Sequence, residues 1–193
     1  LRFCREVVTE RDLFQACGIL YELPAENAGG FPVMRPIAAH GYAITDYASY
    51  KGLLVLTGLA ATAEPGPHVI TSDDGKAAVW VGGVDDLWRL GKPRGEGGPW
   101  IDAAVTAGEP SDPFLIWGFD QRSLDLRHDQ SEPLTVRVEI DLIGNGLWVP
   151  LESLIVPPGS TGHCYDFPTE IQARWVRLTA DRNCRAHAWF SLP

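Results

Sequence analysis

The 193-residue chain has no long hydrophobic run, no C-x-x-C pair and only one methionine. Its longest apolar stretch, residues 53–61, is much shorter than the roughly 20 residues that a bilayer-spanning helix needs. The four scattered cysteines indicate neither a zinc ribbon nor a thioredoxin-type motif. We expect free, buried thiols, and a Cys164–Cys184 disulfide stays open as an alternative that requires neighbouring strands.

Signatures of common enzymes are also missing. The sequence contains no G-x-S-x-G elbow, no H-E-x-x-H, no P-loop and no dinucleotide-binding fingerprint. The 16 basic residues are outnumbered by 25 acidic ones, giving a net charge of −9 that repels phosphate backbones and anionic lipid. We therefore predict neither a nucleic acid nor a membrane as a partner, and no cofactor.

Helical periodicity is scarce. The best helical candidate, residues 10–17, is too short to be stable alone, and proline or glycine interrupts most other windows. Glycine (20) and proline (15) are abundant, as is typical of many turns between short strands. These features predict an all-β fold.

The second half predicts an antiparallel β-sandwich over residues 110–193. Apolar and polar residues alternate along residues 135–142, the glycines of residues 144–146 favour a tight turn, and residues 147–156 return as the partner strand. Pro150 places that partner at an edge or a bulge. A second hairpin is predicted from residues 173–179 and 186–191, and two earlier strands from residues 114–119 and 123–127.

The first half predicts a partial β-propeller of one to two blades over residues 1–109. Successive strands at residues 52–59, 68–71 and 77–81 form a meander of the kind found in one blade. Residues 19–23 and 43–47 belong to a neighbouring blade or to the connection into this one. The domain boundary falls in residues 91–113, which are rich in glycine and proline. A propeller needs about four blades, so we expect an upstream segment or a partner chain to complete it.

Three stretches look familiar as a set. They are Ser72–Gly82 (SDDGKAAVWVG), Asp85–Trp88 (DDLW) with Gly91–Pro93, and Ala180–Phe190 (ADRNCRAHAWF). Together they resemble the C-terminal region of bacterial β-propeller proteins, mostly uncharacterised, that end in a β-sandwich and are associated with polysaccharide use. The resemblance covers nearly the whole chain and implies a secreted or periplasmic protein with carbohydrate as its partner.

Two shorter resemblances concern structure. Ala173–Leu178 (ARWVRL) is similar to a late strand of galactose-binding-like jelly rolls, which makes the predicted sandwich jelly-roll-like. Ser72-x-Asp74-Gly75 followed by Trp80 resembles a degenerate sialidase Asp box, although the glycine directly follows the aspartate. In such boxes the aspartate accepts backbone N–H bonds in a hairpin turn, so this motif predicts structure and not catalysis.

The best candidate site is residues 35–51, which are dense in groups that bind sugar hydroxyls or stack on sugar rings. His40 is a candidate general acid or base and Asp46 a candidate partner, which reaches the propeller's central channel if its strand is an inner one. The candidate substrate-binding residues are Tyr42, Tyr47, Tyr50 and Lys51. The alternative is that His40 and Asp46 satisfy loop backbone groups and that the tyrosines are core.

Other candidates each have a plain structural alternative. Asp73-Asp74 and Asp85-Asp86 offer oxygen ligands for Ca²⁺, yet lack EF-hand spacing and suit solvated turns. Two interpretations are open for Trp148, Trp175 and Trp189: they form a platform on which sugars stack, or they are core residues of the sandwich. His163 and His187 lie near Cys164 and Cys184, so a Cys/His metal site is a further hypothesis. The favoured prediction is that the chain holds no metal.

The expected function is therefore part of a glycan-processing β-propeller protein. As an enzyme it would cleave glycosidic bonds of a plant or microbial polysaccharide, by hydrolysis or β-elimination, with His40 and Asp46 as acid and base. The alternatives are a noncatalytic carbohydrate-binding module and a structural β-sandwich. Whether the chain is an enzyme stays open at this point.

Overall fold

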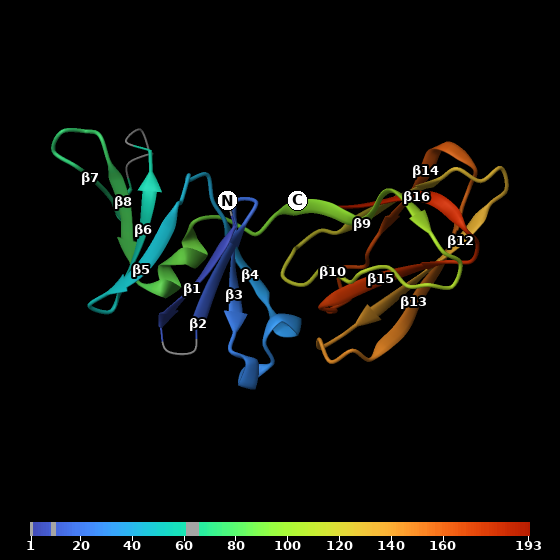
Figure 1. Ribbon diagram of the computed structural model, residues 1–193, viewed down its shortest axis with the longest axis horizontal. Helices are drawn as coiled ribbons and strands as arrows, with labels where there is room; N and C mark the ends of the chain where they lie inside the picture. Colours follow the sequence, from blue (N-terminus) through green and yellow to red (C-terminus); the bar gives the residue numbers. More distant parts are fainter. Residues whose placement is uncertain (1, 9–10, 61–65) are drawn as a thin grey trace. The chain divides into compact units, whose positions relative to one another are not determined.

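The computed structural model describes residues 2–8, 11–60 and 66–193 of the chain. Within these residues the chain folds into four antiparallel sheets of four strands each, with only short 3₁₀ helices between them (Figure 1). The prediction of an all-β fold is confirmed. Among the same residues, no helix has the length and apolar character needed to cross a bilayer.

The chain divides into two compact units, Leu1–Arg94 and Gly95–Pro193. The second unit begins with β9 (Gly95–Val105), a long strand within the segment where the sequence predicts only a boundary. Glycines and a proline hide the alternation of β9, and one of them is required there. A Cβ on Gly98 would lie 1.7 Å from the carbonyl oxygen of Ala188 on the neighbouring strand, so only glycine permits this close approach.

The first sheet of unit 1 is an up-and-down meander in the order β1-β2-β3-β4. Its strands are β1 (Phe3–Val8), β2 (Arg11–Ala16), β3 (Ile19–Pro24) and β4 (Arg35–Ala39). The strand predicted at residues 19–23 is confirmed as β3. The helical candidate at residues 10–17 is wrong, because residues 11–16 form β2, in which Leu13 and Gln15 are buried on one face of the sheet.

The second sheet of unit 1 has the order β5-β6-β8-β7. Its strands are β5 (Asp46–Tyr50), β6 (Leu53–Leu59), β7 (Val69–Thr71) and β8 (Ala78–Gly82). The strands predicted at residues 52–59, 68–71 and 77–81 exist, whereas the one predicted at residues 43–47 lies further along the chain, as β5. The simple meander is wrong, because β8 pairs with both β6 and β7 and lies between them. Local alternation predicts each strand and is silent about which neighbours pair.

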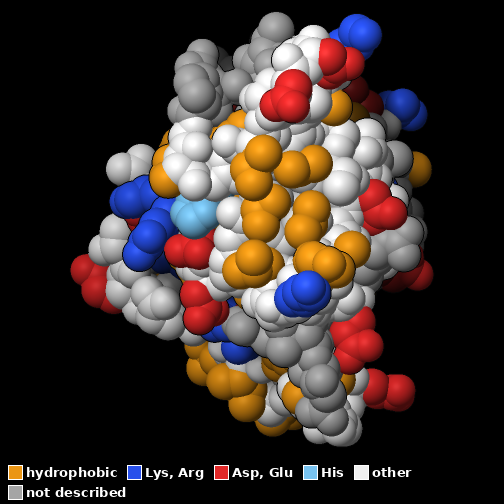
Figure 2. Space-filling view, turned by 90° about the vertical axis from the view of Figure 1, so that its left-hand side faces the viewer, with side chains coloured by type: hydrophobic (Ala, Val, Ile, Leu, Met, Phe, Trp, Pro, Cys, Tyr) orange, Lys and Arg blue, Asp and Glu red, His pale blue; other side chains and the backbone are white. Residues whose placement is uncertain are grey.

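The two sheets of unit 1 share one hydrophobic core. Leu13 and Leu20 of the first sheet pack in the same cluster as Leu54, Leu56 and Trp80 of the second. The hydroxyl of Tyr47 also donates to the carbonyl oxygen of Leu13 across this core. Figure 2 views the molecule from the side of the second sheet, where hydrophobic side chains also gather on the opposite, outer face.

The turn between β7 and β8 is held by the side chains of Ser72 and Asp74. The Ser72 hydroxyl donates to Asp74 Oδ1 (2.7 Å), and the backbone N–H of Lys76 donates to the same carboxylate oxygen (3.1 Å). The hydroxyl, followed by the N–H of Lys76, lowers the pKa of Asp74. The structural role predicted for the Asp-box-like motif is confirmed, and Trp80 is buried in the core beneath it.

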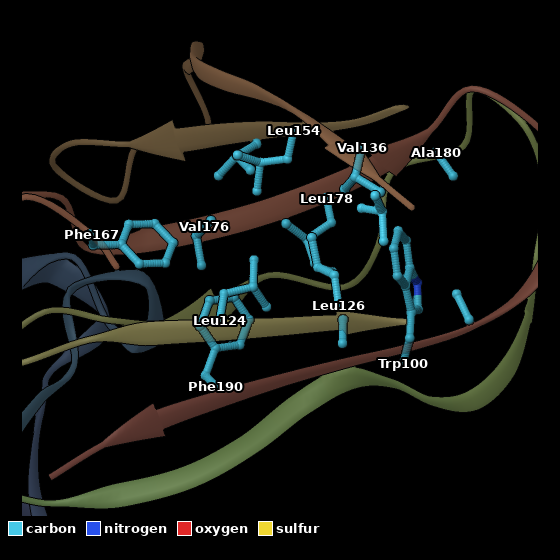
Figure 3. Close-up of a cluster of buried hydrophobic side chains, with 14 of the residues drawn as sticks. Trp100, Leu124, Leu126, Val136, Leu154, Phe167, Val176, Leu178, Ala180 and Phe190 are labelled. Carbon is cyan, nitrogen blue, oxygen red and sulfur yellow. The ribbon is translucent and has the colours of Figure 1, made fainter. Parts of the chain in front are cut away.

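Unit 2 is a two-layer arrangement of sheets with the orders β10-β15-β12-β13 and β14-β11-β16-β9. The strands are β10 (Phe114–Leu115), β11 (Ser123–His128), β12 (Leu134–Asp141), β13 (Trp148–Val156), β14 (Gly159–Asp166), β15 (Trp175–Ala180) and β16 (Cys184–Leu192). Inward side chains from both sheets, among them Val136, Leu178, Leu124 and Phe190, fill the space between the layers (Figure 3). These chains form one continuous core.

The first predicted hairpin of unit 2 is confirmed as β12 and β13. Gly144 and Gly146 both take a positive φ of 80° in the turn, which glycine adopts without strain. Pro150 lies on β13, an edge strand, next to a register shift opposite Val138 and Glu139. The prediction that this strand lies at an edge or a bulge holds in both respects.

The second predicted hairpin is wrong. Strands β15 and β16 follow each other in the sequence but belong to different sheets, so residues 181–183 carry the chain across the sandwich. Strand β15 pairs with β12, and β16 pairs with β11 and β9. Two consecutive strands show the same period-2 pattern whether they pair within one sheet or lie in opposite sheets of a sandwich. The sequence pattern therefore does not distinguish the two topologies.

The cysteines are free, as expected, but only Cys184 is buried. Strand β11 lies between β14, which carries Cys164, and β16, which carries Cys184, so the alternative disulfide lacks the neighbouring strands it requires. Burial raises the pKa of the Cys184 thiol, which keeps it protonated and unreactive.

Asp141 organises the turn between β12 and β13. Its carboxylate accepts hydrogen bonds from the backbone N–H groups of Gly144 (2.8 Å) and Gly146 (2.7 Å), and also from Ile143 and Asn145. Burial alone would raise the pKa of Asp141, but these four N–H groups outweigh burial and lower it.

We predict that Asp141→Asn lowers the free energy of unfolding at pH 7 by about 1–3 kcal/mol, since hydrogen bonds to a charged group are lost. A lowered folded-state pKa stabilises above the unfolded value near 4. That stabilisation disappears as the pH falls through the folded pKa, so the deficit should shrink as the pH is lowered below the unfolded value. Urea unfolding at several pH values measures it, with Glu132→Gln, an exposed carboxylate of the same unit, as control. A deficit independent of pH would contradict this role.

Candidate functional site

Residues 35–51, the predicted site, span β4, a connection and β5 in unit 1. His40 follows β4, and its backbone N–H donates to the carbonyl of Gly18 (2.9 Å). Both ring nitrogens are buried and have no side-chain hydrogen-bond partner among the described residues, so Asp46 does not orient the imidazole by a hydrogen bond. Burial lowers the pKa of His40, and a Tyr42 backbone group opposes this in part.

Asp46 and Tyr47 point to opposite faces of the second sheet, as consecutive strand residues must. Tyr47 is 1% exposed and lies in the core of unit 1. The Asp46 carboxylate accepts the backbone N–H of Tyr47 (2.8 Å). The structure therefore places Tyr47 among core residues, the plainer of its two interpretations.

The remaining predicted ligand-binding residues are Tyr42 in the connection before β5, Tyr50 at the end of β5 and Lys51 in the turn after it. Tyr42 stacks on His40 with ring centroids 6.4 Å apart, beside the core. Tyr50 is 63% exposed, and the Lys51 ammonium lies 5.3 Å from its ring centroid. These two residues lie four to five positions along the chain from Asp46, or roughly 13 Å or more along a strand. The structure brings His40 together with Tyr42, and Tyr50 with Lys51, but does not join the two pairs.

The role of Tyr47 yields a prediction with a matched control. Tyr47→Phe removes the buried hydrogen bond to the Leu13 carbonyl, so we expect the free energy of unfolding to fall by about 1 kcal/mol. Tyr50→Phe changes an exposed ring on the same strand and should leave stability unchanged. Thermal unfolding followed by circular dichroism compares them. Equal melting temperatures for Tyr47→Phe and wild type would contradict a structural role for this hydroxyl.

The candidate metal ligands do not come together in the structure. Asp86 accepts the N–H of Gly83 (2.8 Å) and pairs with Arg89 (3.4 Å) in the 3₁₀ helix Val84–Arg89. His163 shares the face of Leu126, a core residue, whereas His187 pairs with Arg127 on the outer face of the same sheet. Across the described residues, no three His, Cys, Asp or Glu side chains converge as metal ligands would.

A different group of polar side chains assembles on unit 2. On the β14-β11-β16-β9 sheet, Leu124, Leu126, Ala188 and Phe190 point into the core, so the residues between them point outward. Asp125 pairs with Trp189, and Arg127 with His187, in adjacent rows of the sheet. These four residues, with Asp102, form what we call the Trp189 face.

The geometry of the Trp189 face is well defined. The rings of Trp189 and His187 stack with centroids 6.0 Å apart and 19° between planes. Asp125 Oδ1 lies 3.0 Å from Arg127 Nε, and Asp102 Oδ1 lies 3.8 Å from His187 Nδ1. Asp102 takes a positive φ of 49° where β9 bulges, which directs an exposed carboxylate to the edge of the face. A partly exposed indole is thus surrounded by acceptors and donors of hydrogen bonds.

A hollow of about 360 Å³ adjoins this face at the start of β11. It is lined by Gln121, Arg122, Ser123, Asp166, Phe167, Thr169 and Pro193. Ser123 and Asp166 form the sheet row next to that of Asp125 and Trp189, which is about 7 Å away along the strand. The volume lies in the range of small-molecule sites, which is roughly 300–1,000 Å³.

Arg122 holds one wall of this hollow. It is 6% exposed and donates to the backbone carbonyls of Ile171 (2.7 Å) and Pro168 (3.2 Å). Its Nε is buried without a partner among the described residues. Burial lowers the pKa of Arg122, but a guanidinium stays charged at neutral pH. The loop is therefore fixed by a buried cation whose hydrogen-bonding capacity is not exhausted.

The other two predicted platform tryptophans lie on the opposite sheet. Trp148 and Trp175 both pair with Asp141, one on each side of it. Trp175 is only 8% exposed, and the Arg177 guanidinium lies 4.5 Å from the Trp148 ring centroid, where Glu139 holds it (2.9 Å). The three tryptophans therefore form no common platform, and only Trp189 lies on the face beside the hollow.

Comparisons with known proteins add no assignment. No family model, curated protein or solved structure matches the chain. Trp189 and His187 are candidates from the sequence, whereas Asp102, Asp125, Arg127 and Arg122 are not. The signal available was the outward set of alternating residues in the strand at residues 123–127, of which Asp125 and Arg127 are members.

Proposed function

We propose that the chain is a noncatalytic, carbohydrate-binding part of a secreted or periplasmic β-propeller protein that uses plant or microbial polysaccharides. The observation that carries this proposal is the stacked Trp189–His187 pair, which lies between Asp102, Asp125 and Arg127 and beside the hollow at Ser123. The resemblance of the sequence to glycan-associated propeller proteins supports the same substrate class.

The chemistry of the Trp189 face suits a sugar. An indole presents a flat apolar surface on which the C–H groups of a sugar ring pack. Carboxylates accept hydrogen bonds from sugar hydroxyls and the guanidinium donates to them, so both roles of a hydroxyl are served. The adjoining hollow provides depth for one end of the ligand, with the buried Arg122 in its wall.

The glycosidic-bond-cleaving enzyme is the second candidate, and the feature that favours it is His40, whose buried ring nitrogens lack side-chain partners among the described residues. Under this alternative His40→Ala abolishes turnover of a polysaccharide and spares its binding. Under our proposal no turnover depends on His40. The noncatalytic proposal is preferred because Tyr47 lies in the core, while Tyr50, the last residue of β5, and Lys51, in the following turn, are separated along the chain from Asp46, the first residue of β5.

Binding of neutral and uronate-containing oligosaccharides by isothermal titration calorimetry tests the proposal. We predict that Trp189→Ala raises the dissociation constant at least tenfold, because the sugar ring loses the indole surface on which it packs in the complex. Trp148→Ala, a tryptophan of the opposite sheet, should change it less than twofold. The proposal fails if wild type retains no saccharide in such a panel, which favours a purely structural module, or if the two variants bind alike.

A further inference from the structure

The second sheet of unit 1 is apolar on both of its faces. Its inner face packs in the core, while the register places a second set of apolar side chains together on the outer face. This outer β5–β8 face consists chiefly of Tyr50, Leu53, Val55, Ile70, Val79 and Val81. The side chains at its margin are strongly exposed, with 63% for Tyr50 and 58% for Ile70.

Such a face is unusual for an antiparallel sheet that meets water. Sheets with one solvated side alternate apolar and polar residues, and sheets apolar on both sides are normally covered on both sides. Figure 2 shows the hydrophobic side chains of this face as one continuous area, with charged side chains at its two ends. Contiguous apolar areas of this kind mark interaction surfaces.

The charges at the two ends of the face are of opposite sign. Lys51 lies in the turn between β5 and β6, whereas Asp73 and Asp74 lie in the turn between β7 and β8. Leu54 pairs with Gly82 and Leu59 with Ala78, so the two turns lie at opposite ends of the strands. Lys76 pairs with Asp74 (3.4 Å), and Asp73 together with Asp46, which pairs with Thr57 on the outer face, makes that end negative.

We propose that the outer β5–β8 face is covered by the same face of a second copy of this chain, in a twofold-symmetric dimer. A twofold axis perpendicular to the strands brings the Lys51 end of each copy against the Asp73 end of the other, whereas an axis parallel to the strands brings like charges together. The apolar side chains supply affinity, and the end charges select the first arrangement.

This dimer commits to a second copy of the chain, where the sequence alone leaves open an upstream segment or a partner chain that completes a propeller. Its sheets pack face to face, as the two sheets of unit 1 already do around their common core. The proposal is independent of carbohydrate binding, which concerns unit 2. A failure of one therefore leaves the other standing.

The first test is the oligomeric state of the whole chain, measured by sedimentation equilibrium over the micromolar range. We expect a monomer–dimer equilibrium whose dissociation constant rises at least tenfold in Ile70→Lys. Ile155→Lys is the matched control, since Ile155 is 68% exposed on β13 of unit 2. A wild-type chain that stays monomeric, a trimer or larger assembly, or equal weakening by both variants would overturn the proposal.

The second test addresses the arrangement. Lys51→Glu and Asp73→Lys should each weaken the dimer, and the double variant should restore it, because the exchanged charges face each other again. Circular dichroism and saccharide binding of each variant confirm that the fold and unit 2 are intact. A double variant that is as weak as the sum of the single changes would contradict the pairing of these two ends.

Discussion

The need of each antiparallel sheet to bury an apolar face against another sheet governs this protein. Helices make up little of the described chain, so no helical layer is available to cover a sheet. In each unit two four-stranded sheets therefore face each other, with Leu13 and Leu56 in one shared core and Leu124 and Leu178 in the other. What remains on the outward faces is available for function.

The outward faces differ in chemistry. The β14-β11-β16-β9 sheet presents an indole among carboxylates and a guanidinium, whereas the second sheet of unit 1 presents aliphatic side chains. A polar face with one aromatic ring suits a hydroxyl-rich ligand, and an aliphatic face suits another sheet. The same architecture thus offers two chemically different faces, for which we propose two kinds of recognition, one in each unit.

Period-2 alternation makes individual strands predictable here, and topology is where prediction fails. The strand at residues 135–142 and its hairpin are evident because Gly144 and Gly146 punctuate a clean pattern. The crossing of the chain between β15 and β16 is invisible, because the pattern records which face is buried and not which sheet the strand joins. Strand β9 is not predicted, because Gly97, Gly98 and Pro99 interrupt the alternation of apolar and polar residues along it.

The candidate site follows the same logic. Residues close in sequence along one strand, such as Asp46 and Tyr47, point to opposite faces, so a dense segment does not make a site. The Trp189 face instead gathers residues from β9, β11 and β16, whose proximity depends on pairing that the sequence does not specify. The sequence alone makes Trp189 and His187 candidates, but it does not predict the carboxylates and the guanidinium that lie around them.

Saccharide binding by the Trp189 face is tested most directly by titrating the ¹⁵N-labelled chain with an oligosaccharide and following the indole N–H signals of its seven tryptophans by NMR. We predict that the Trp189 signal, assigned with Trp189→Phe, shifts in a saturable manner while the Trp148 signal stays in place. Saturable shifts confined to Trp80 and Trp88 in unit 1, with an unmoved Trp189, would contradict it.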